Sequence, residues 1–65
     1  MLYVNQNKIV VKQYKNILTL ETTCIQLIMP TYKLKIIGEN FIVMYLSQNE
    51  MHICGKMKDV HFIYE

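Results

Sequence analysis

The sequence has no arginine, no tryptophan and no alanine, and it has only one proline. Without arginine, the chain lacks the planar guanidinium group that forms paired hydrogen bonds with phosphates and guanine edges. The seven lysines are scattered along the chain and form no dense run. A strong electrostatic footprint for nucleic acid is therefore missing, and we expect no nucleic-acid partner.

Residues for nucleophilic catalysis are also scarce. Ser47 and Asp59 are the only serine and the only aspartate, and both stand in polar, turn-like stretches. Cys54 with His52 or His61 is a conceivable thiol–imidazole pair, but no obvious neighbour would orient the imidazole. Phosphate loops, dinucleotide fingerprints and EF-hand loops are absent. We expect a protein that is not an enzyme.

A metal site has weak support. His52 and Cys54 share one face of an expected strand, and Cys24 and His61 have the side chains to join them. Four such ligands in one place would suit Zn²⁺. No CxxC or HxxxH spacing is present, so a strand histidine beside a small buried cysteine is the simpler interpretation. We expect no metal and no cofactor.

Long apolar runs are missing as well, because none approaches the ~20 residues that a transmembrane helix needs. The start, "MLYVNQNK", lacks the basic segment and long apolar core of a signal peptide. Cys24 and Cys54 do not resemble a disulfide framework, and we expect both to be buried free thiols in a reducing cytosol. These features predict a soluble intracellular protein without a transmembrane segment of its own.

The sequence does have many hydrophobic residues for its length. They make up 52% of 65 residues, a length that allows a single domain over residues 1–65. A sphere this small is mostly surface. Part of the apolar content must therefore lie near the outside or against a partner.

Short runs rich in Ile, Val, Leu, Tyr and Thr alternate with turn-like clusters, a pattern that predicts strands. Helical periodicity fails throughout, so we expect an all-β fold with about seven short strands. An antiparallel meander forming a roll or small sandwich is expected. A β-solenoid is the alternative, because Ile36 and Ile53 each precede a glycine by two residues, a pattern that also suits coil corners. The expected strands are residues 8–13, 17–20, 24–29, 32–37, 41–46, 51–56 and 60–64.

Alternation within these strands indicates which side chains point inward. One expected inward set is Ile25, Leu27, Met29, Tyr32, Leu34, Ile36, Met51 and Ile53. Gly38 and Gly55 stand where a strand should end and a turn begin, so we expect a positive φ at both.

The stretch "FIVMYL" is apolar on both faces of its expected strand. Phe41, Val43 and Tyr45 are expected in the core. The other face then carries a row formed by Ile42, Met44 and Leu46. A row of three large apolar side chains left in water would be prone to aggregation. We therefore predict that Ile42, Met44 and Leu46 form an interface.

Three segments give the chain a resemblance to a known family. They are "VVKQYKNIL" at residues 10–18, "TCIQLIMPTYKLKIIGENFIV" at residues 23–43 and "NEMHICGKMKDVHFI" at residues 49–63. Together they resemble the YabP/YqfC family of sporulation proteins of spore-forming Firmicutes, with Gly55 in the expected place. The resemblance covers almost the whole chain.

The resemblance implies a non-enzymatic role in spore envelope (cortex or coat) assembly, with no catalytic residues to carry over. The expected partners are further copies of the chain, a sporulation membrane protein, or both. The expected location is the cytoplasm of the mother cell during sporulation, or the forespore membrane. The alternative function is a small β-barrel module that binds nucleic acid or glycan.

Overall fold

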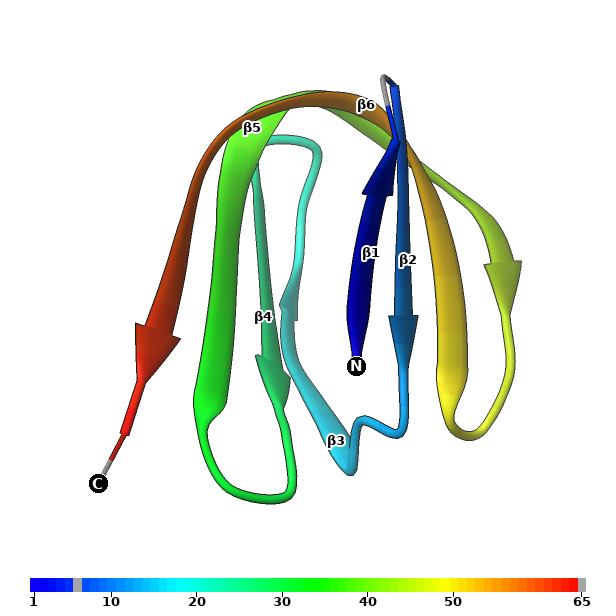
Figure 1. The fold of residues 1–65 in the computed structure, drawn as a ribbon. Coiled ribbons are helices and arrows are strands. Elements are labelled where there is room, and N and C mark those ends of the chain that lie inside the picture. Colours follow the sequence, from blue (N-terminus) through cyan, green and yellow to red (C-terminus); the bar gives the residue numbers. More distant parts are fainter. Residues whose placement is uncertain (6, 65) are drawn as a thin grey trace.

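A computed structural model describes residues 1–5 and 7–64, and it is all-β, as the sequence predicts (Figure 1). Every neighbouring pair of its six strands is antiparallel, in the sheet order β1-β2-β6-β5-β4-β3. Antiparallel pairing throughout rules out the solenoid alternative. The strands are β1 (Leu2–Asn5), β2 (Lys8–Lys12), β3 (Asn16–Leu20), β4 (Cys24–Ile28), β5 (Lys33–Leu46) and β6 (Glu50–Ile63).

The two 14-residue strands, β5 and β6, fold the sheet over on itself. Both arch over the top of the molecule and descend in its other half (Figure 1). Within β6, only residues 50–54 pair with β2, and within β5, only residues 33–37 pair with β4. The first layer is therefore β1, β2 and residues 41–46 and 50–54. The second layer is β3, β4 and residues 33–37 and 57–63.

One hydrophobic core lies between the two layers. The inward alternation predicted from the sequence is confirmed, because residues such as Leu27, Leu34 and Ile53 are fully buried. Burying each large aliphatic side chain contributes roughly 1.5–3 kcal/mol in transfer terms. The buried set is Ile9, Val11, Tyr14, Ile25, Leu27, Met29, Leu34, Ile36, Phe41, Met51 and Ile53.

Gly38 and Gly55 lie inside β5 and β6, so the predicted turns at these glycines are wrong. Of the two, only Gly55 has a positive φ, of 141°. Both glycines sit at the bend because a Cβ would collide there. On Gly38 it would lie 2.1 Å from the Lys56 carbonyl oxygen, and on Gly55 2.8 Å from the Asn40 carbonyl oxygen. The Phe41 ring fills the remaining space beside both.

Backbone groups at the bend are hydrogen-bonded by loops rather than by strands. The Gly38 N–H donates to the Thr23 carbonyl at 3.0 Å, and the Phe41 N–H donates to the Thr22 carbonyl at 2.9 Å. These bonds satisfy backbone groups of β5 at the bend, where its register with β6 shifts. The predicted strands 32–37 and 41–46 fall largely within the single strand β5, and 51–56 and 60–64 fall largely within β6.

Candidate interaction surface at the end of strand β5

The last part of β5 is an open edge of the sheet. On one side, residues 42–46 pair with β6, and no other described residue forms a ladder with them on the other side. The Ser47 N–H donates to the Glu50 carbonyl at 2.8 Å, which makes these two a hydrogen-bonded pair. Because such pairs alternate in antiparallel ladders, the neighbouring pair, Leu46 and Met51, is not hydrogen-bonded. The Leu46 N–H and C=O therefore point toward the open edge.

Four large apolar side chains are exposed on this edge. The exposed fractions are 61% for Ile42, 63% for Met44, 52% for Tyr45 and 50% for Leu46. We call these four residues the β5 edge patch. The patch contains all three residues that the sequence predicts as an interface. Their contact with a partner stays a prediction.

A β-bulge explains why Tyr45 joins the patch. Val43 is opposite Ile53, but Tyr45 is opposite His52, so Met44 is an extra residue in β5. The extra residue reverses the alternation, because successive side chains point to opposite faces. The prediction that Tyr45 lies in the core is therefore wrong, because Tyr45 is opposite His52 on the outer face. The prediction that Leu46 shares a face with Ile42 is also wrong, because Leu46 is opposite the buried Met51 on the inner face. Phe41 is buried and Val43 is half-buried. No feature of the continuous apolar run marks where the bulge occurs.

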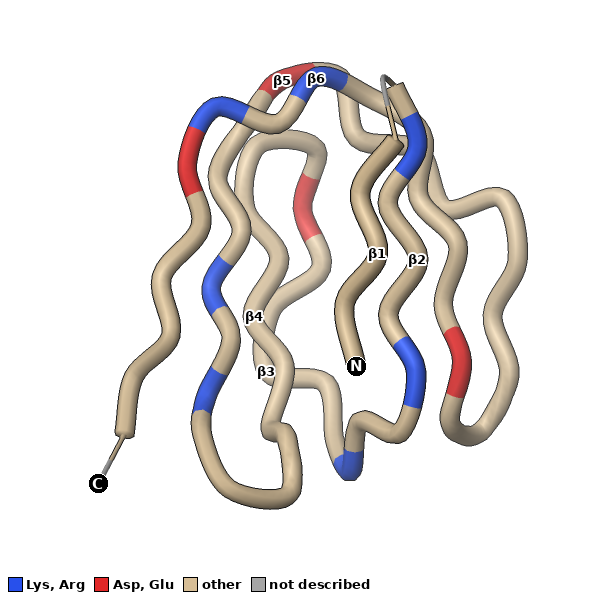
Figure 2. Tube along the Cα trace, viewed as in Figure 1, with Lys and Arg blue, Asp and Glu red and all other residues tan. Residues whose placement is uncertain are grey.

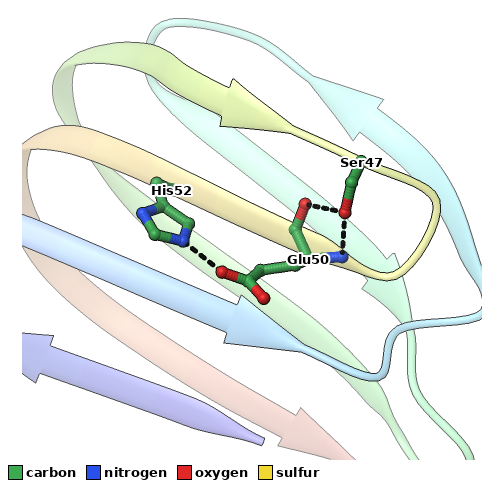
Figure 3. Close-up of polar contacts among 3 residues, drawn as sticks. All are labelled: Ser47, Glu50 and His52. Atoms are coloured by element: carbon green, nitrogen blue, oxygen red, sulfur yellow. Dashed lines mark hydrogen bonds and ion pairs between the residues drawn. The ribbon is translucent and has the colours of Figure 1, made fainter.

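Beside the patch, a polar cluster occupies the β5–β6 turn and the start of β6 (Figure 3). The Glu50 N–H donates to Ser47 Oγ at 3.1 Å, and Oγ donates to the Glu50 carbonyl at 3.3 Å. The His52 imidazole is hydrogen-bonded instead to the Glu50 carboxylate. This bond, with a smaller contribution from Lys12, lowers the pKa of Glu50. Because the Ser47 hydroxyl is used by the turn, it is not aligned with the imidazole as a nucleophile would be.

Two further contacts hold the cluster in place. The Tyr14 hydroxyl donates to the Ser47 carbonyl, and burial raises the pKa of Tyr14. The Tyr45 and His52 rings lie edge to face, with centroids 5.1 Å apart. The turn that follows the β5 edge patch is therefore fixed by the protein's own side chains.

The residues considered for a metal site are not brought together. Cys54 and His52 lie in the first layer, whereas Cys24 is opposite Ile37 in the second layer. His61 is also in the second layer, paired with Asp59 at 3.0 Å. Among residues 1–5 and 7–64, no three His, Cys, Asp or Glu side chains are grouped so as to hold a metal ion. Both cysteines are free thiols. The sequence predicts that they are buried, whereas in the structure they are half-buried.

The patch itself contains no charged residue. The descending end of β5, at the right of Figure 2, carries no charged residue. Among the described residues, there is no helix that is long and apolar enough to cross a membrane.

The chain matches no protein-family model, no curated protein and no solved structure. The functional argument therefore depends on the β5 edge patch, on the polar cluster beside it and on the resemblance noted in the sequence.

Proposed function

We propose that the protein is a non-enzymatic assembly component of the bacterial spore envelope, acting in cortex or coat formation in the mother cell. It works through self-association or by binding a membrane partner, in the cytoplasm or at the forespore membrane. The observation that carries this proposal is the exposed β5 edge patch. The sporulation context comes from the resemblance to the YabP/YqfC family.

The patch supports an interaction role because it combines two features that isolated proteins avoid. It exposes large apolar side chains next to one another, and it lies on a strand edge with free backbone groups. Covering each side chain contributes roughly 1.5–3 kcal/mol in transfer terms, which helps to offset the entropy lost on association.

The polar cluster supports a role without catalysis. Ser47 bonds to the backbone of its own turn, and His52 bonds to Glu50. Within the cluster, the hydroxyl and the imidazole therefore already have structural partners. The imidazole and the carboxylate are both half-buried and are hydrogen-bonded to each other on one strand.

A genetic experiment tests this proposal. Deleting the gene in its host is expected to lower the yield of heat- and lysozyme-resistant spores without slowing vegetative growth. Wild-type protein should restore the yield, whereas Met44→Lys should not. Leu18→Lys is the control, because Leu18 is an exposed apolar residue on the edge strand β3. Normal spores from the deletion strain would overturn the proposal.

A further inference from the structure

We propose that the β5 edge patch pairs with the same patch of a second copy of this chain. The two β5 ends would run antiparallel across a two-fold axis, joining the two sheets. This inference rests on the self-association part of the proposed function, and it specifies both the surface and the partner.

The first argument comes from a comparison of the open edges. Along the second half of β6, the edge carries Lys58, Asp59 and His61, and such charges discourage strand pairing. The β3 edge is broken by a bulge between Ile17 and Thr19, and β1 is only four residues long. The β5 edge also contains a bulge, at Met44, but it has no charge and no proline from residue 40 to residue 49. Ile42 and Met44, at 61% and 63%, are more exposed than any large apolar residue of the other edge strands.

The second argument is that the patch is complementary to itself. A two-fold contact places the same surface on both subunits, so apolar residues must meet apolar residues. The antiparallel arrangement satisfies this condition because every residue of the patch is apolar or aromatic. The bulge at Met44 shortens the regular stretch and places Ile42 and Leu46 on opposite faces. Side chains on both faces of the joined sheets would therefore contribute to the contact, Ile42 on the outer face and Leu46 on the inner face.

The third argument concerns the charges that bound the segment. These are Glu39, which forms an ion pair with Lys58, and Glu50, whose carboxylate is hydrogen-bonded to the His52 imidazole. Each carboxylate thus already has a partner within its own chain, and neither lies in the segment 40–49 that would meet the second copy. An anionic membrane surface is a poorer occupant, because lysines rather than glutamates would have to flank the patch.

The test begins with the mass of the purified protein in solution. We expect a concentration-dependent dimer by analytical ultracentrifugation. Leu46→Lys is expected to raise the dimer dissociation constant more than about tenfold, because it places two charges in an apolar contact. Leu18→Lys is the matched control and should leave the constant within about twofold. Leu18 and Leu46 are both 50% exposed on edge strands, and the substitution adds the same charge to each.

A second measurement needs no variant and detects backbone pairing. Hydrogen exchange of the Leu46 amide is expected to slow as protein concentration rises, because its N–H finds an acceptor in the second copy. The Tyr45 amide, already facing β6, serves as the internal reference and should not change. This measurement remains decisive if Leu46→Lys fails to fold.

The outcomes separate this inference from the proposed function. A dimer that Leu46→Lys leaves intact, with unchanged Leu46 exchange, would overturn the β5 pairing while self-association stands. A protein that stays monomeric at millimolar concentration would overturn the proposal that a second copy covers the patch. Flotation with anionic phospholipid vesicles through this patch would overturn it as well. In either case the spore phenotype still tests the proposed function independently.

Discussion

At the scale of single residues, the approach of Gly38 to the Lys56 carbonyl decides how closely β5 and β6 can cross at the bend. Phe41 occupies the space that two missing side chains leave, and its ring lies against both glycines. The bend is therefore formed by an aromatic ring and by two positions where no Cβ fits. Neither contact is visible from local sequence, in which "GEN" and "GKMKD" look like ordinary turns.

Gly38→Ala should lower the free energy of unfolding by about 2 kcal/mol or more, because its methyl group would meet the Lys56 backbone rather than a flexible side chain. Urea denaturation followed by circular dichroism measures this change. Lys56→Ala, which alters an exposed side chain at the same crossing, should stay within about 0.5 kcal/mol of wild type. Equal midpoints for Gly38→Ala and wild type would mean that the bend has room for a methyl group.

The Glu50 carboxyl should titrate below its ordinary pKa of 4.5, mainly because of its hydrogen bond with His52. A pKa that folding lowers contributes stability above the ordinary value, and this contribution is lost as the pH falls through the folded-state pKa. In His52→Val, carboxyl-detected NMR should show the Glu50 pKa moving up.

Glu39 provides the reference in the same spectra, because its pKa is lowered mainly by Lys58 on a different part of the sheet. It should titrate identically in wild type and in His52→Val. If Glu50 also titrates unchanged, the imidazole does not hold the carboxylate in solution.

At the scale of elements, the alternation of side chains predicted which face of each strand is buried. This prediction does not depend on where a strand is thought to begin or end, because side chains point to the same face at every second residue. Leu34, Ile36, Met51 and Ile53 are inward as predicted. The phase fails only where an extra residue enters the ladder, and so Tyr45 lies on the outer face. Strand β1 was not predicted, because its four residues are ordered by pairing with β2 rather than by a pattern of their own.

The bend in β5 also depends on Asn40, whose φ is 56°. Asparagine and glycine tolerate this left-handed region, whereas β-branched residues do not. Asn40→Gly should therefore change the free energy of unfolding by less than about 1 kcal/mol, and Asn40→Val should cost about 1–2 kcal/mol more than Asn40→Gly. Thermal or urea denaturation of the two variants side by side measures the difference. Equal stability would show that the bend relaxes to a negative φ at this position.

At the scale of the whole molecule, β5 and β6 run through both layers. Pairing of β2 with β6 joins segments that lie about 40 residues apart in the sequence, and no local pattern predicts this partner. The all-β class was therefore predictable, whereas the sheet order was not. The same holds for the β5 edge patch: its composition was visible, but its position on an open edge was not.

Because the layers share both long strands, they should unfold together. In residue-resolved NMR during urea unfolding, the Val11 signal of the first layer and the Leu27 signal of the second should have the same midpoint. An earlier transition at Val11 would show that the first layer opens while the second stays folded. Dilute protein is the appropriate sample, because dimerisation would stabilise the first layer selectively.

The sharing of strands also has a consequence for how this chain can be divided. The first layer draws on residues 2–12 and 41–54, and the second on residues 16–37 and 57–63, so the two contributions are interleaved. No single break separates the two layers into different fragments. A split at the turn between Gln48 and Asn49 would give two pieces that each lack part of both layers. Recombination within the gene faces the same restriction, so the chain is expected to be exchanged between longer proteins only as an undivided unit.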